Sequence, residues 1–192
     1  MGNLHPSTIP ALGHLEPGRT KWHRVTLPGV ALADEARPVT TITGAKPGPV
    51  RFVGAGVHGG EYPAVETVIR LGTELNAAEI AGTVVLMPVL TLPAFRQRSS
   101  FVCPVDKVNP TGVFSGDPDG TSSEQMAHAL LNEFVVHADA YLDLHGGDIP
   151  ETPVPLTICR AGNEPVDAKA MEVARVFDLP HIFTEDWWLY RS

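Results

Sequence analysis

The chain has 192 residues, 14 lysines and arginines against 22 aspartates and glutamates, and a formal net charge of −8. Because 43% of the residues are apolar and 19% are charged, the chain can bury a sizeable core, which excludes global disorder. An acidic chain without a basic run binds phosphate backbones poorly, so we expect no nucleic-acid partner. No run of about 18 apolar residues occurs, so we expect no membrane partner.

The cysteines indicate the cellular compartment, and the glycines and prolines indicate the class of fold. Cys103 and Cys159 form no CxxC motif, which favours a reducing cytoplasm, and the first thirty residues contain no secretory leader pattern. The 18 glycines and 18 prolines are spread along the whole chain. They predict a loop-rich α/β protein, and the sequence leaves open whether it forms a homo-oligomer.

The first part of the chain predicts an N-terminal arm and edge strands over residues 1–44. Residues 1–20 have no periodic pattern and are expected to be irregular. Short strands are predicted at 22–27 and 39–43, and the proline-glycine sequence at 46–49 predicts a turn.

A strand, a helix and a second strand are predicted next. Residues 50–57 form an apolar run typical of a buried strand, and Pro63 suits the first turn of a helix that reaches about Asn76. Residues 83–87 are a second apolar strand. Such a βαβ unit places its two strands parallel to each other.

The rest of the chain continues this alternation after a long irregular segment. Residues 88–120 have few periodic features, and a loop of that length usually has a functional reason. Thr121 and Glu124 match a capping box and begin an amphipathic helix that is predicted to reach about His137. The later elements are predicted as strands at 140–145, 156–159 and 181–183 and as a helix at 166–177.

The first candidate site lies where the apolar strand 50–57 ends. His58 and Glu61 are separated by two glycines, and ligands of open α/β sheets bind beyond the carboxyl ends of parallel strands. A polar loop in which Glu61 merely favours the helix N-terminus is the alternative interpretation.

A second histidine occupies an equivalent place. Strand 140–145 ends at His145, which is again followed by two glycines. If the strands are parallel, His58, Glu61 and His145 meet at one edge and form a three-ligand zinc set with a fourth position open for water. Asp143 lies on the same side of the strand as His145, so it can orient that ligand or simply bond to the backbone.

Four motifs in this order resemble the succinylglutamate desuccinylase/aspartoacylase family of the zinc carboxypeptidase-like (M14) superfamily. They are His-Gly-Gly-Glu-Tyr-Pro-Ala from residue 58, the segments 88–96 and 106–116, and Asp-Leu-His-Gly-Gly-Asp from residue 143. The resemblance implies a three-layer α/β/α fold with a mostly parallel, mixed central sheet. It also implies one Zn²⁺ per chain, held by His58, Glu61 and His145.

By the same resemblance, the expected activity is hydrolysis of the amide bond of a small N-acyl substrate, such as an N-acyl amino acid, through metal-activated water. Residues 45–192 would form the catalytic domain, incomplete at its C-terminus, with the family's C-terminal β domain absent. The family's catalytic glutamate follows the third ligand, and no residue matches its motif. Glu151, Glu164 and Glu185 are therefore unassigned, and the general base is unknown.

The substrate-binding loop departs from the family pattern Asp-x-x-Asn-Leu-Asn-Arg-x-Phe-Pro-Gly. Asn109 matches the pattern and is expected to bind substrate, but Thr111 and Gly112 replace its second Asn and its Arg. Loss of that arginine argues against a substrate with a free α-carboxylate, unless Arg96 or Arg98 supplies the charge. Two alternatives therefore stay open, a zinc carboxypeptidase that acts on peptides and a catalytically inactive metal-binding module.

Overall fold

The computed structural model describes residues 8–28, 35–149 and 151–185. The chain divides into two compact units, Met1–Glu151 and Thr152–Ser192. Within the described ranges, no helix combines the length and the apolar character that crossing a membrane requires.

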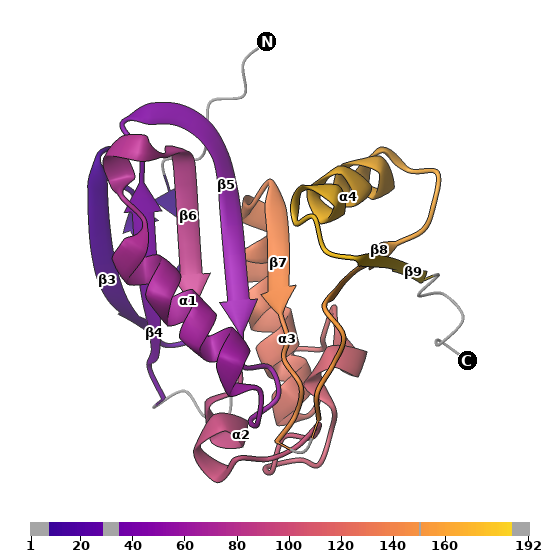
Figure 1. Cartoon of the computed structure of the whole chain (residues 1–192). Coiled ribbons are helices and arrows are strands. Elements are labelled where there is room, and N and C mark those ends of the chain that lie inside the picture. The colour runs from indigo at the N-terminus through magenta and orange to yellow at the C-terminus, as the bar shows by residue number, and fades with distance from the viewer. Residues whose placement is uncertain (1–7, 29–34, 150, 186–192) are drawn as a thin grey trace. The chain divides into compact units, whose positions relative to one another are not determined.

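The first unit is built on a five-stranded mixed sheet with the order β3-β4-β6-β5-β7 (Figure 1). The strands are β3 (Arg19–Val25), β4 (Arg37–Thr43), β5 (Lys46–Ala55), β6 (Ala81–Met87) and β7 (Ala140–Leu144). β5 pairs in parallel with both β6 and β7, whereas β4 is antiparallel to β3 and β6. The predicted parallel βαβ unit is therefore confirmed, and residues 19–25 and 37–43 add an antiparallel side to the same sheet.

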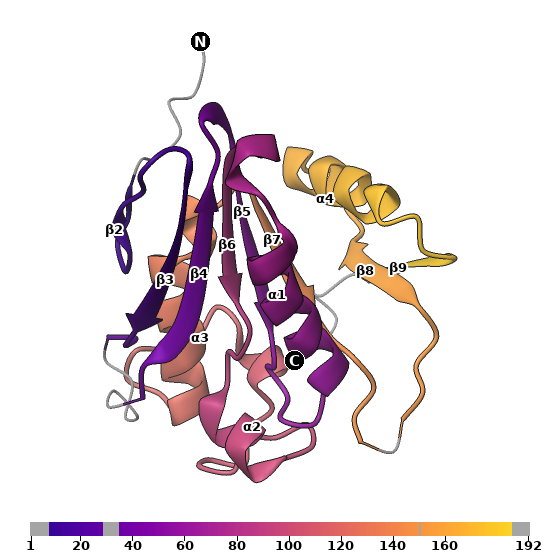
Figure 2. The same cartoon turned by 60° about the vertical axis from the view of Figure 1, so that its left-hand side comes forward.

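Helices cover both faces of this sheet, which confirms the predicted three-layer fold (Figure 2). α1 (Tyr62–Glu74) buries Ala64 and Val68 on one face, in a cluster with strand residues of β4, β5 and β6. α3 (Ser122–Glu133) buries Met126 and Leu130 on the other face. There Phe52 of β5 stacks on Phe134 and Tyr141, with ring centroids 5.2 and 5.1 Å away.

The N-terminal segment is more regular than predicted. β1 (Thr8–Ile9) and β2 (Gly13–His14) form a small antiparallel pair, and β3 already begins at Arg19, so the prediction of an irregular arm to residue 20 was wrong for residues 8–9, 13–14 and 19–20. Ile9 and Leu15 are buried in the core and anchor this pair. Two-residue strands are too short to produce a periodic pattern, which is why the sequence did not reveal them.

Two further predictions are corrected. Residues 46–49 belong to β5 rather than to a turn, because a shift of register between Lys46 and Val50 accommodates the prolines at a sheet irregularity. The segment 88–120 contains α2 (Leu92–Gln97) and the 3-10 helix η2 (Pro110–Val113). Both begin with a proline in the first turn, and both are shorter than the window in which helical periodicity is visible.

The helix termini follow the capping residues. The Thr121 hydroxyl accepts from the Glu124 amide and the Glu124 carboxylate accepts from the Thr121 amide, so the predicted capping box is confirmed. α3 ends at Glu133 and is followed by the 3-10 helix η3 (Val135–His137), where the sequence predicted one continuous helix. α1 ends at Glu74, two residues earlier than predicted, and η1 (Ala77–Glu79) follows it.

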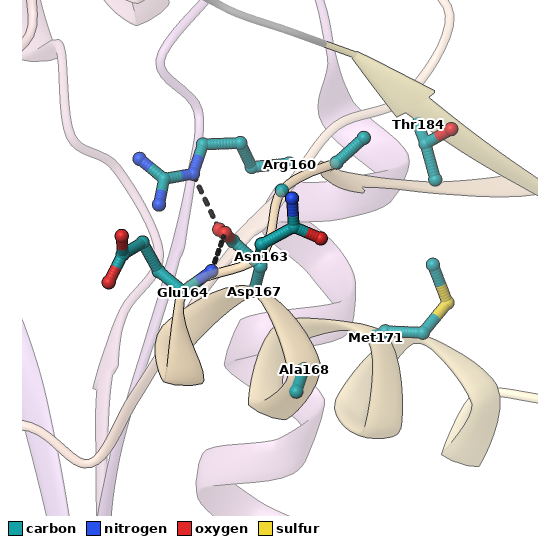
Figure 3. Close-up of a pocket in the computed structure, with 9 residues that line it drawn as sticks. Arg160, Asn163, Glu164, Asp167, Ala168, Met171 and Thr184 are labelled. Carbon is teal, nitrogen blue, oxygen red and sulfur yellow. Dashed lines mark hydrogen bonds and ion pairs between the residues drawn. The ribbon is translucent and has the colours of Figure 1, made fainter.

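Over its described residues, 152–185, the second unit contains two parallel strands and one helix. β8 (Leu156–Arg160) pairs with β9 (His181–Glu185), and α4 (Pro165–Val176) lies between them in the chain. Figure 3 shows a pocket of this unit in which the Asp167 carboxylate accepts from Arg160 Nε at 2.5 Å and from the Glu164 amide at 2.9 Å. None of the residues predicted to form the functional site lines this pocket.

The loop after β5 is held by close backbone packing against α2. The Gly59 amide donates to the Ser99 carbonyl at 2.9 Å, and a Cβ atom added at Gly59 would lie 1.9 Å from the Ala94 carbonyl oxygen. No side chain fits at that distance, so the first glycine after His58 is required for this contact.

We expect Gly59→Ala to lower the free energy of unfolding by about 1–3 kcal/mol, because the new methyl group pushes the loop away from α2. The matched control is Gly112→Ala, since a Cβ at Gly112 meets nothing within 4 Å. Its effect should stay within about 0.5 kcal/mol. Urea unfolding of both variants measures the difference, and equal stability of the two would contradict the packing described here.

Candidate metal centre

Three side chains from two neighbouring strands meet at one edge of the sheet. β5 ends at Ala55 and leads to His58 and Glu61, while β7 ends at Leu144 and is followed at once by His145. The parallel register places Ala55 opposite Leu144. The nitrogen and oxygen atoms that His58, Glu61 and His145 offer all lie within 4.8 Å of one another. The prediction that both histidines reach the same edge of the sheet is confirmed.

The Glu61 carboxylate lies between the two imidazole rings. His58 Nδ1 is 2.8 Å from Glu61 Oε1, and His145 Nδ1 is 3.1 Å from Glu61 Oε2. His58 and Glu61 are buried, whereas the His145 side chain keeps 37% of its surface exposed. The cluster is therefore fixed on the β5 side and accessible on the β7 side.

The outer nitrogen of each ring also has partners. His58 Nε2 lies 3.0 Å from Asn109 Oδ1 and 3.2 Å from Thr111 Oγ1. His145 Nε2 lies 3.3 Å from Asp143 Oδ2. Both rings thus turn Nδ1 toward Glu61 and Nε2 toward a second polar side chain, neutral for His58 and charged for His145.

These contacts shift the pKa values of all three groups. Burial alone would raise the pKa of Glu61, but the hydrogen bonds from His145 and His58 outweigh it and lower the pKa to about 2. Burial likewise opposes the charged form of His145, yet the hydrogen bonds to Asp143 and Glu61 raise its pKa to about 10. For His58, bonds to Glu61 and Asn109 overcome burial and raise the pKa above its usual value.

The donor set fits a bound cation. Asn109 Oδ1 accepts from the Thr111 amide at 3.1 Å, so this oxygen is the acceptor that faces His58 Nε2, which must then carry a proton. A neutral His58 would point the lone pair of Nδ1 at the Glu61 carboxylate, and two acceptors 2.8 Å apart require a positive charge between them, a proton or a metal ion. Two imidazole nitrogens and one carboxylate oxygen are typical ligands of catalytic zinc.

Of the three residues predicted to bind substrate, Asn109 lies at the cluster, and it contacts His58. Arg96 forms an ion pair with Glu35, and Arg98 ends α2 in the left-handed conformation with an exposed side chain. Among the contacts found for the described residues, neither arginine reaches His58, Glu61 or His145.

Three residues near the cluster were not predicted as part of it. Thr111 contacts His58, as described, and the ring of Phe101 stands edge-on to His58 at a centroid distance of 5.8 Å, with 47% of the residue exposed. Asp148 is buried against Gly60, where an added Cβ would lie 1.9 Å from its Oδ1 atom. The Asp148 amide donates to Glu151 Oε2 at 3.1 Å. Only its place in the second His-Gly-Gly segment could have indicated Asp148 from the sequence.

The chain is similar to several known proteins. The chain is 30% identical over 147 residues to an N-alpha-acetyl-L-2,4-diaminobutyric acid deacetylase of Halomonas elongata, covering 75% of this chain and 42% of that protein. The crystal structure of a succinylglutamate desuccinylase/aspartoacylase from Rhodobacter sphaeroides superposes with a TM-score of 0.74 at 27% identity, covering 87% of this chain and 52% of that one.

A more distant structure supports the predicted carboxypeptidase-like fold. A metallo-carboxypeptidase from Burkholderia cenocepacia has a TM-score of 0.63 at 13% identity, covering 89% of this chain and 51% of that chain. The chain thus spans about half the length of these relatives. A model of the family described as the succinylglutamate desuccinylase/aspartoacylase catalytic domain matches residues 47–186. With this match over most of its length, the chain belongs to the succinylglutamate desuccinylase/aspartoacylase family.

Proposed function

We propose that this protein binds one Zn²⁺ through His58, Glu61 and His145 and hydrolyses the amide bond of a small N-acyl compound. The observation that carries the proposal is the convergence of two Nδ1 atoms on one carboxylate at the carboxyl edge of the sheet. The deacetylase relative from Halomonas elongata supports an N-acyl amino acid as the substrate class.

The chain's own residues have separate tasks in this proposal. A bound zinc ion supplies Lewis-acid polarisation of an acyl carbonyl and lowers the pKa of water. The Asp143 carboxylate accepts a hydrogen bond from His145 Nε2–H and so keeps Nδ1 of that ring turned toward Glu61. Phe101 offers an exposed apolar face beside His58, against which an acyl group can pack. The open side at His145 admits the substrate.

An inactive metal-binding module is the second candidate, and a specific observation favours it. Amide hydrolysis needs a group that takes a proton from water and passes it to the leaving amine. Among the described residues, the carboxylates in contact with the cluster are Glu61 and Asp143, and both are engaged by the histidines. Glu151 instead accepts from the Asp148 amide. Gly112 replaces the arginine of the family pattern, which argues against recognition of a free carboxylate, whether of a peptide C-terminus or of an N-acyl amino acid. The deacetylase relative favours the N-acyl compound over the peptide.

The activity test uses the zinc-loaded chain with N-acetyl-L-2,4-diaminobutyrate, other N-acetyl amino acids and short peptides, with release of amine as the measurement. We expect release from the N-acetyl compounds that a chelator abolishes and His58→Ala removes, because both treatments empty the metal site. Preference for peptides would favour the carboxypeptidase alternative. Zinc binding without turnover of any substrate would favour the inactive module.

Zinc content provides a test that does not depend on turnover. After dialysis against zinc, we expect about one zinc per chain in the unmodified protein and less than about a tenth of that in His58→Ala and His145→Ala, because each loses one of three protein ligands. His128→Ala is the matched control, since His128 lies on α3 and contacts Asn132 instead of the cluster. Elemental analysis that finds no zinc in the unmodified protein would contradict the proposal.

The pKa of His145 predicts that zinc uptake releases protons. With a pKa of about 10, the metal-free ring still carries its proton at pH 8, and zinc must displace that proton to reach Nδ1. We therefore expect at least one proton, that of His145, to be released per zinc at pH 8, a second to follow from His58 Nδ1 where that atom carries one, and the apparent affinity to rise with pH toward 10. A pH indicator in weakly buffered solution measures this release.

Asp143→Asn serves as the control for the source of the proton. The substitution removes the carboxylate that holds His145 Nε2, so the pKa of His145 falls and the release at pH 8 should become smaller. An equal release from both proteins would show that His145 is not the source.

A further inference from the structure

Thr111 makes a contact with His58 that its place in the sequence does not predict. It stands where the family pattern has a second asparagine, yet its hydroxyl oxygen lies 3.2 Å from His58 Nε2. Asn109 Oδ1 lies 3.0 Å from the same nitrogen and also accepts from the Thr111 amide. One N–H group of His58 therefore faces two acceptors that belong to a single turn of the chain.

We propose that Thr111 is a positioning residue for His58, whose hydroxyl shares the Nε2 proton with Asn109 and so keeps Nδ1 turned toward Glu61. Rotation of the ring by half a turn would put Cε1 in the place of Nε2, so the Thr111 hydroxyl oxygen and Asn109 Oδ1 would both lose the His58 donor, at a cost in free energy. With the proton held on Nε2, Nδ1 becomes the nitrogen available to a metal ion. The metal-binding part of this inference rests on the proposed function.

The turn that carries Thr111 is itself firmly attached to the body of the unit. Asp106 Oδ2 accepts from the Ser123 amide at 2.6 Å, and Asp106 Oδ1 accepts from the Ser123 hydroxyl and from the Val108 amide, each at 3.1 Å. The Cys103 amide donates to the Val108 carbonyl at 2.9 Å. The loop is thus pinned to the start of α3.

Pro110 completes this arrangement directly before Thr111. It is buried in the first turn of η2, where its ring fixes the backbone. The hydroxyl is therefore presented to His58 by a loop whose conformation is set before a metal arrives, and the entropy lost in placing it is small.

His58 and His145 differ in the charge of the side chains that face Nε2 of each ring. Asp143 brings a full negative charge to His145, whereas Asn109 and Thr111 orient His58 without adding charge. Neither acceptor can exchange a proton with the ring near neutral pH, so the pair favours a proton on Nε2 through geometry alone, whereas the Glu61 carboxylate, 2.8 Å from Nδ1, favours a proton on Nδ1. Removing the hydroxyl should therefore change the tautomer without changing the charge of the site.

The test compares Thr111→Val, which keeps the shape and loses the hydroxyl, with Thr111→Ser, which keeps the hydroxyl. Thr67→Val is the control for a threonine elsewhere, because the Thr67 hydroxyl donates to the Pro63 carbonyl within α1. The first measurement is the nitrogen NMR spectrum of His58 in the metal-free protein, at a pH where the ring is neutral. The second is zinc affinity in competition with a chelator.

We expect Thr111→Val to raise the fraction of the tautomer protonated at Nδ1 and to weaken zinc binding about tenfold. Thr111→Ser and Thr67→Val should match the unmodified protein in both measurements. Urea unfolding of the metal-free variants separates this effect from a loss of stability. Identical tautomer ratios in Thr111→Val and Thr111→Ser would overturn the inference.

The two measurements separate this inference from the proposed function. If no variant binds zinc, the proposed function fails, while the tautomer ratio of the metal-free protein still decides whether Thr111 positions His58. If zinc binds and the affinities of Thr111→Val and Thr111→Ser are equal, the positioning role is overturned and the proposed function stands.

Discussion

The parallel pairing of β5 with β7 is the constraint on which the candidate site depends. It makes both strands end at the same edge, with Ala55 opposite Leu144, so that the loops that follow them deliver His58 and His145 to one carboxylate. A shift of this register by one residue would turn His145 to the other face of the sheet, where Leu142 and Leu144 pack against α1. The hydrophobic layers on the two faces therefore fix the geometry of the cluster as well as the fold.

The sequence predicted the parts of this arrangement that depend on long or periodic patterns. The apolar runs of β5 and β6, the capping box at Thr121 and the histidine at the end of β7 were all visible, and they sufficed to bring His58, Glu61 and His145 together. The resemblance to the family supplied the three-layer arrangement around them. Such features are encoded locally, or follow from the direction of neighbouring strands.

What the sequence did not predict depends on contacts between distant segments. Thr111 and Phe101 belong to a segment without periodicity, and only the folded chain brings them to His58, which precedes Thr111 by 53 positions. The sequence did not predict the short strands β1 and β2 or the helix α2, because each is shorter than two periods of the strand or helix pattern. Arg96 was predicted to bind substrate, but the fold pairs it with Glu35, a residue 61 positions away that its own sequence neighbours do not indicate.

The spacing of the cluster along the chain affects the order of assembly. His58 and Glu61 are three positions apart and can meet in a nearly unfolded chain, whereas His145 lies 84 positions beyond Glu61. Closing a loop of that length is entropically costly and has to wait for non-local strand pairing. An ion that joins all three side chains would thus act as a cross-link between the early and late parts of the first unit, slowing its unfolding more than it speeds its folding.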